Sequence, residues 1–116
     1  MLNIFRTDKT LSVTQKMIVE SVKNFCKDKL KPRVIYDYKN EIVDRNLFRE
    51  FGKMGIFGPT INDYNCLGES YKTYGLIAKE IEYIDSGYRS MFSVQSSLVM
   101  NPIFQYGSLS VKEKYL

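Results

Sequence analysis

Histidine and tryptophan are absent from this sequence, and there are only three prolines and two cysteines. The absence of histidine excludes Ser-His and Cys-His catalytic triads, imidazole metal sites and histidine acid–base chemistry. Cys26 and Cys66 lack the spacing of metal ligands, and we expect two reduced thiols, with Cys26 buried on an apolar helix stripe. No metal site is predicted. Any catalysis must come from carboxylates, from a cofactor or from another part of a longer protein.

The sequence also lacks a long apolar run and a basic block. No stretch of about eighteen apolar residues is present, so no membrane span is predicted. Residues 1–10 have neither the apolar core of a secretory signal nor the composition of a transit peptide, and we interpret them as an N-terminal arm without a targeting segment. The net charge is +4, but the cations are spread between acids. This distribution argues against nucleic acid as a partner.

What is present is typical of one globular domain. The 116 residues are 44% hydrophobic and 26% charged, which allows one modest core. Apolar residues recur at helical spacing, and no strand-like alternation of convincing length appears. The sequence therefore predicts an all-α domain over residues 11–116.

Capping residues place the first three helices. Ser12 and Gln15 form a capping-box pattern ahead of a helix that should run to about residue 30. Pro32 follows it, and a short second helix is expected at residues 34–38. Asp44 can cap a third helix, which Gly55 is placed to end.

A long loop at residues 56–70 separates these helices from the next ones. It is rich in turn formers, and a loop of this length is usually functional or shaped by a neighbour. Ser70 or Glu69 is expected to open a fourth helix and Gly87 to end it. A fifth helix is predicted over residues 88–100, with Pro102 breaking it before one further turn at 103–106.

Ser110 and Glu113 form a second capping-box pattern close to the end of the sequence. Only three residues follow Glu113, and so short a helix is marginal in isolation. We therefore expect the chain to stop inside an element and to be a fragment of a longer protein.

Arg89 is the residue that most needs an explanation. On the predicted fifth helix, Arg89, Ser93 and Ser96 follow one another at i, i+4 and i+7, as a single polar file. The opposite side is apolar: Met91, Val94 and Leu98. A helix that is apolar nearly all round is expected to be buried. A cation beside a core needs an anion to offset its desolvation.

Two interpretations of Arg89 are open. The first is a structural ion pair with Glu82 or Asp85, because buried charges are mostly paired. The second is an anion-binding pocket, because the guanidinium fork matches a carboxylate bidentately.

Several stretches in order resemble one known family. They are DSGYRS at residues 85–90 and SVQSSLVM at 93–100, supported by GPTI at 58–61, YGLIA at 74–78 and YGS at 106–108. Together they resemble the N-terminal helical domain of acyl-CoA dehydrogenases, and within that family they are most similar to the glutaryl-CoA dehydrogenases. Several long matching stretches in the same order are a stronger signal of relationship than one short motif.

The resemblance implies an orthogonal bundle of about five to six helices that forms one wall of a substrate cleft. The parent protein would be an FAD-dependent enzyme that oxidises an acyl-CoA thioester between its α and β carbons. The glutamate base and most of the flavin site would lie in a middle β-domain and a C-terminal helical domain. No catalytic residue is therefore expected in this chain, which alone should be inactive and should not retain FAD.

The resemblance also implies roles for individual residues and partners. In the glutaryl-CoA type, Arg89 pairs with the substrate carboxylate, Ser90 is a neighbouring contact, and Glu82 and Ser93 hold the arginine and the acyl tail. The product would lose carbon dioxide to give crotonyl-CoA. Family members are typically homotetramers that pass electrons to an electron-transfer flavoprotein. The compartment would be the mitochondrial matrix in a eukaryote or the cytoplasm in a bacterium.

The sequence departs from the family pattern in three places. The Trp-containing segment that often precedes the first helix is absent, Asp63 and Leu67 replace smaller loop residues, and Met91-Phe92 is bulkier than usual, which could narrow the pocket. Two alternatives stay open. One is a dehydrogenase for an uncharged short or branched acyl chain, and the other is a stand-alone helical module that binds a protein or a CoA ester.

Overall fold

The computed structural model describes residues 10–116, so nearly all of the predicted N-terminal arm lies outside the described residues. The helical segments are α1 (Val13–Phe25), the π-helical η2 (Cys26–Leu30), α2 (Val34–Lys39), α3 (Arg45–Lys53), α4 (Tyr71–Glu82), α5 (Ser86–Ser93), the π-helical η3 (Val94–Met100), α6 (Asn101–Tyr106) and α7 (Leu109–Tyr115). Because α1 runs directly into η2, and α5 runs through η3 into α6, residues 10–116 form six continuous helices and no strand. The all-α prediction is confirmed.

Three helix starts follow the predicted capping chemistry. At α1, the Gln15 N–H donates to the Ser12 hydroxyl while the Gln15 side chain accepts from the Ser12 N–H, both at 3.1 Å. Asp44 caps α3 by accepting from the Asn46 N–H. Ser70 caps α4 by accepting from the Thr73 N–H. Each side-chain oxygen satisfies an amide that has no partner within its helix.

The predicted end of the fourth helix at Gly87 is wrong. Helix α4 ends at Glu82, and Asp85 accepts hydrogen bonds from the N–H groups of Gly87 and Tyr88. Gly87 thus lies in the first turn of α5. Because Asp85 caps the amides of Gly87 and Tyr88, the new helix has already started before the glycine, which therefore does not act as a C-cap.

The predicted break at Pro102 is also wrong. The helix continues through it to Tyr106, because η3 is wound as a π-helix in which the Asn101 N–H reaches the Ser96 carbonyl five residues back. A π-helical stretch accommodates a proline that would disturb a regular i to i−4 ladder.

The predicted second capping box, Ser110 with Glu113, is wrong as well. Ser108 and not Ser110 accepts from the Val111 N–H and starts α7.

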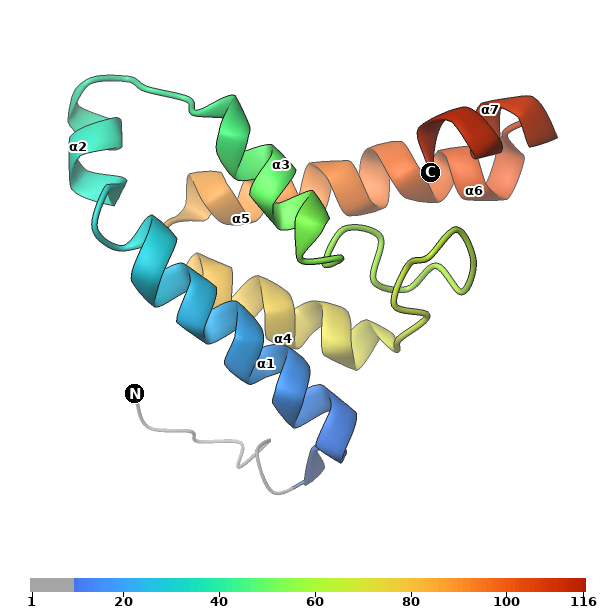
Figure 1. The fold of residues 1–116 in the computed structure, drawn as a ribbon, viewed down its shortest axis with the longest axis horizontal. Coiled ribbons are helices and arrows are strands. Elements are labelled where there is room, and N and C mark those ends of the chain that lie inside the picture. The colour runs from blue at the N-terminus through green and yellow to red at the C-terminus, as the bar shows by residue number, and fades with distance from the viewer. Residues whose placement is uncertain (1–9) are drawn as a thin grey trace.

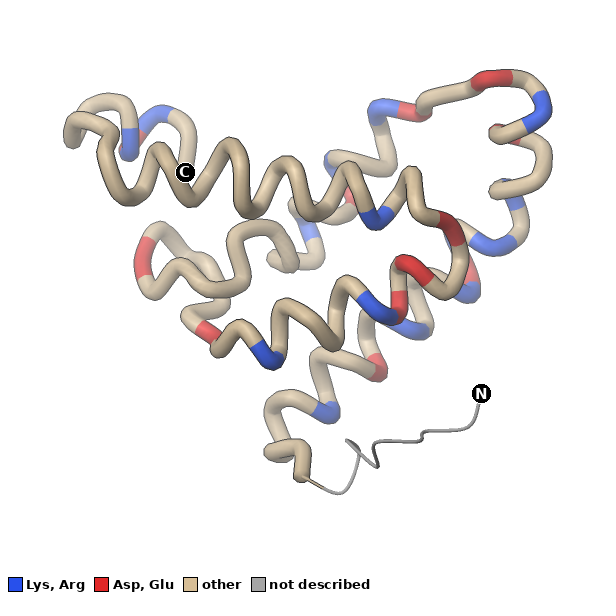
Figure 2. The backbone as a smooth tube through the Cα atoms, turned by 180° about the vertical axis from the view of Figure 1, so that it is seen from behind, with Lys and Arg blue, Asp and Glu red and all other residues tan. Residues whose placement is uncertain are grey.

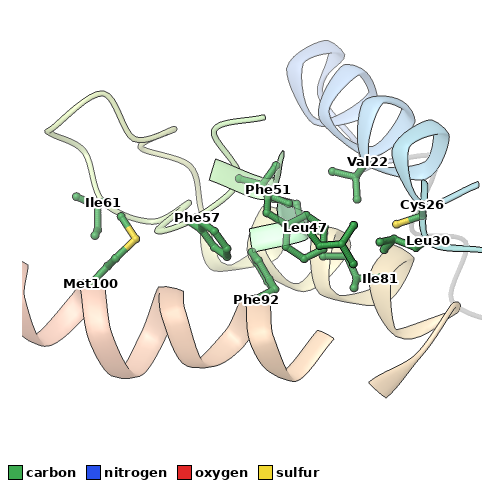
Figure 3. Close-up of a cluster of buried hydrophobic side chains, with 12 residues drawn as sticks. Val22, Cys26, Leu30, Leu47, Phe51, Phe57, Ile61, Ile81, Phe92 and Met100 are labelled. Atoms are coloured by element: carbon green, nitrogen blue, oxygen red, sulfur yellow. The ribbon is translucent and has the colours of Figure 1, made fainter. Parts of the chain in front are cut away.

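The core lies where α1, α3, α4 and α5 converge. Figure 1 shows α1 and α4 side by side, with the continuous helix from α5 to α6 starting beside the end of α4 and running across the upper part of the view. The core side chains come from all four helices: Val22, Cys26, Leu30, Leu47, Phe51, Ile77, Ile81 and Phe92. Figure 3 shows that Phe57, Ile61 and Met100 extend this cluster along η3, where the 56–70 loop closes over it.

The long helix is buried on one side only. Phe92, Ser96 and Met100 are buried at successive turns, whereas Leu98 is 70% exposed and Val94 and Val99 are also exposed. The prediction that this helix is buried nearly all round is therefore wrong. The fold is flat, with extents of 42 × 40 × 19 Å. A helix at the surface of such a layer buries one side against the core and leaves its other side exposed. Among the described helices, none has the length and apolar character needed to span a bilayer.

Candidate functional site

The corner between α4 and α5 brings Arg89 and Glu82 together. The Arg89 Nε donates to the Glu82 Oε2 at 2.6 Å. The hydroxyl of Ser86 donates to the other carboxylate oxygen, Oε1. These two hydrogen bonds, the one from Ser86 first, hold the pKa of Glu82 below its usual value. Glu82 is therefore a carboxylate at neutral pH, fixed at both oxygens.

Of the two anions that the sequence left open for Arg89, Glu82 is the partner. Asp85 instead accepts from the N–H groups of Gly87 and Tyr88 at 2.7 and 3.2 Å, which uses its carboxylate as a helix cap. Ser86 was not found from the sequence. On a single helix, a spacing of four residues would predict a contact between Ser86 and Glu82. Here the two residues lie on either side of the break between α4 and α5.

The other edge of the Arg89 guanidinium is open. Within residues 10–116, its Nη1 and Nη2 atoms have no hydrogen-bond partner. Arg33 is the contrast, because its Nε and Nη1 bond to Asp37 at 2.6 Å and to Asp44 at 2.7 Å. The Arg33 fork thus serves two carboxylates of the fold, whereas Arg89 is anchored by Nε and leaves the planar pair of terminal nitrogens for another anion.

The three predicted serines differ in their surroundings. Ser90 is exposed and directly follows Arg89, and Ser93 is partly buried one turn further along the helix. Neither side chain has a hydrogen-bond partner within the described part of the chain. Ser96 is buried and accepts from the Gly58 N–H at 3.1 Å. Within the predicted file, Ser93 thus has an accessible hydroxyl one turn from Arg89, whereas Ser96 anchors the 56–70 loop.

A second network fixes the start of α5 and was missed by sequence reasoning. The hydroxyl of Tyr88 donates to the Asp37 Oδ2 at 3.2 Å, across 51 positions in the sequence. Asp37 also holds Arg33, so α2 is tied to the residue next to Arg89. Burial, followed by the hydrogen bond to Asp37, raises the pKa of Tyr88 to about 12. The neutral hydroxyl thus remains a donor, and this bond orients the turn that carries Arg89.

Known proteins match almost the whole chain. The family model described as "Acyl-CoA dehydrogenase, N-terminal domain" matches residues 12–116. A probable short/branched chain specific acyl-CoA dehydrogenase from Dictyostelium discoideum is 30% identical over 109 residues, covering 92% of this chain and 26% of that protein. The mitochondrial isovaleryl-CoA dehydrogenase of Bos taurus is 28% identical over 109 residues, covering 91% of this chain and 26% of that protein.

Solved structures agree with these matches. A glutaryl-CoA dehydrogenase from Mycobacterium smegmatis, in complex with FADH2, superposes with a TM-score of 0.91 at 37% identity and covers 98% of this chain. This chain covers 30% of that structure and 26% of each of the two relatives above. The chain therefore spans less than a third of the length of the proteins it matches.

Proposed function

This chain belongs to the acyl-CoA dehydrogenase family, and on that premise we propose that residues 11–116 are the N-terminal helical domain of an FAD-dependent acyl-CoA dehydrogenase and form one wall of its substrate cleft. The whole protein would remove the α proton of an acyl-CoA with a carboxylate base and pass the β hydride to the flavin. The base and most of the flavin site would be supplied from outside this chain. The lengths of its relatives leave ample room for both.

We propose glutaryl-CoA as the substrate, and the observation that carries this proposal is the open edge of Arg89. A planar donor pair held in place by a fixed carboxylate matches a second carboxylate bidentately. Glu82 would orient the arginine, and Ser90 and Ser93 would contact the acyl tail beside it. Loss of carbon dioxide from the dehydrogenated product would then give crotonyl-CoA. The structural match to a glutaryl-CoA dehydrogenase supports the same substrate.

The test is Arg89→Ala in the whole protein that carries this domain, with Arg49→Ala as the control. Arg49 is an exposed arginine whose Nη1 lies 3.4 Å from the Asn46 amide oxygen. We expect Arg89→Ala to lower kcat/KM for glutaryl-CoA about 100-fold, because the substrate carboxylate would lose its charged partner inside the closed cleft of the whole protein. Turnover of butyryl-CoA should change by less than about threefold, and Arg49→Ala should leave both substrates unaffected.

Equal losses with both substrates would assign Arg89 to a structural ion pair and end the carboxylate proposal. A second candidate substrate is an uncharged short or branched acyl-CoA, which the Dictyostelium and bovine relatives favour. It predicts that the unmodified protein prefers isovaleryl-CoA or butyryl-CoA. A protein without flavin and without acyl-CoA oxidation would contradict both and favour a stand-alone helical binding module.

The partners of the whole protein are part of this proposal. We propose a homotetramer that passes electrons to an electron-transfer flavoprotein. The compartment would be the mitochondrial matrix in a eukaryotic source or the cytoplasm in a bacterial one. The relatives include a mitochondrial enzyme from Bos taurus and an acyl-CoA dehydrogenase from Bacillus subtilis, which is consistent with either setting.

A further inference from the structure

A hollow of about 730 Å³ lies between the C-terminal parts of the α1–η2 helix and of α4. Four of its lining residues are lysines, Lys23, Lys27, Lys31 and Lys79. Its volume is in the range of pockets that hold small organic ligands. Figure 2 shows charged residues gathered around these helix ends, in contrast to η3 and α6, which carry none.

The lysines form two facing walls. Lys23 in α1, Lys27 in η2 and Lys31 just after η2 follow one another at intervals of four residues along one wall, and Lys79 belongs to α4 on the other side. Within residues 10–116, none of the four side chains has a hydrogen bond or an ion pair. The hollow therefore gathers several ammonium groups without partners.

Two carboxylates also line the hollow but do not balance these cations. Glu82 is already paired with Arg89, and Glu80 is left opposite four lysines. The lysines at the helix ends also offset the partial negative charge of the last carbonyl groups. Even with that contribution, the side-chain charge of the hollow is positive, so its ligand should be anionic.

The remaining lining residues give the hollow an apolar floor and an aromatic edge. Cys26 is 2% exposed and Ile84 is partly buried against the core. Tyr83 is 68% exposed and also lines the hollow, so its ring is accessible to a ligand. A flat apolar group could lie on Tyr83 and Ile84 while anionic oxygens reach the lysines.

We propose that this hollow binds a phosphorylated aromatic small molecule of the nucleoside diphosphate class. Lysine binds phosphate as a point charge, and several lysines along one wall suit the spread charge of a diphosphate better than that of a single carboxylate. The aromatic base stacks on Tyr83. This site does not depend on the role proposed for Arg89, whose side chain is not part of the lining.

The test is titration of the ¹⁵N-labelled 116-residue chain with ADP, adenosine and inorganic pyrophosphate, followed by amide chemical shifts. ADP should give saturable shifts at the ends of η2 and α4, with a dissociation constant on the order of 1 mM or below. Adenosine and pyrophosphate should each bind at least about tenfold more weakly, because each supplies only one half of the ligand. Equal binding of pyrophosphate and ADP would overturn the aromatic part of the proposal.

Charge-matched variants distinguish a specific binding site from non-specific electrostatic attraction between the basic chain and an anion. Lys27→Gln with Lys79→Gln removes two lining charges, and Lys29→Gln with Lys53→Gln removes two exposed charges from helix ends outside the hollow. The first pair should weaken ADP binding at least about tenfold, and the second less than about twofold. Equal weakening by the two pairs, or shifts spread over the whole surface, would overturn the proposal.

Discussion

At the scale of single residues, Thr73 joins two helices through its buried hydroxyl. It is fully buried, accepts a hydrogen bond from the Gln15 side chain at 3.1 Å and donates to the Glu69 carboxylate at 2.8 Å. We expect Thr73→Val to lower the free energy of unfolding by about 1–3 kcal/mol, because it leaves both partners unsatisfied at nearly constant volume. Urea denaturation measures this loss. The exposed Thr14→Val on α1 is the control, and equal changes in the two variants would contradict the buried network.

The two thiols should differ in reactivity. Burial, followed by the charge of Glu80, raises the pKa of Cys26 to about 11, and Cys26 is only 2% exposed. At neutral pH its reactive thiolate is therefore scarce and shielded, and its alkylation rate should rise as the pH approaches 11. Mass spectrometry after brief iodoacetamide treatment should find Cys66 modified first. Faster labelling of Cys26 would show that the α1–η2 junction opens readily.

The sequence narrowed the partner of Arg89 to Glu82 or Asp85 but did not decide between them. Asp85 is excluded as the partner because it caps α5. The sequence did not show this, because the start of the fifth helix was predicted at residue 88, two residues too late. The bond from Tyr88 to Asp37 could not be found, because it joins residues 51 positions apart and no sequence pattern links Asp37 to the DSGYRS stretch that contains Tyr88. Local patterns identify candidate groups, and tertiary structure decides their pairing.

At the scale of elements, the 56–70 loop depends on Gly58. Its φ is +57°, and a Cβ there would lie 2.9 Å from the Met100 Cε and 3.0 Å from the Ile61 Cδ1. We expect Gly58→Ala to destabilise the fold by about 1–3 kcal/mol, through backbone strain and crowding. Gly75→Ala is the control with the opposite sign. Gly75 lies in α4 with open space around it, so alanine there should stabilise by about 0.5–1 kcal/mol.

Thermal or urea unfolding of the two glycine variants decides this point. If Gly58→Ala were as stable as the unmodified chain, the loop would not be held against η3 in the way described. Ser96→Ala, which removes the hydroxyl that accepts from the Gly58 N–H, would then also be expected to leave the free energy of unfolding unchanged.

Helix starts were easier to predict than helix ends. Ser12 and Asp44 were identified correctly, and Ser70 is the one of the two predicted caps, Ser70 or Glu69, that starts α4, because a cap and its amide lie within three residues of each other. The continuation through Pro102 was not predicted, because it depends on π-helical winding over seven residues of η3, which no local residue pattern marks. Ser108 and Ser110 are both plausible caps, and only the path of the chain after α6 selects between them.

At the scale of the whole molecule, the fold is flat and open. Its radius of gyration is 14.9 Å, compared with about 13 Å for a compact domain of this length. The exposed side of η3 adds to this openness, because Val94, Leu98 and Val99 are exposed apolar residues on a segment that carries no charge (Figure 2). We call these three residues the η3 face. The sequence could indicate their apolar character, but their exposure depends on which side of the helix the core occupies.

The η3 face should cause the 116-residue chain to self-associate, because a contiguous apolar patch in water gains free energy when it is covered. We expect sedimentation velocity to show a mass that rises with concentration. Val94→Gln with Leu98→Gln should return the chain toward a monomer, because both side chains are exposed and can be made polar without disturbing the core. Val13→Gln with Ile35→Gln is the matched control, because these exposed residues lie on α1 and α2, away from η3. A chain that is monomeric at every concentration, or a control that dissociates it equally, would show that the η3 face is not a contact surface.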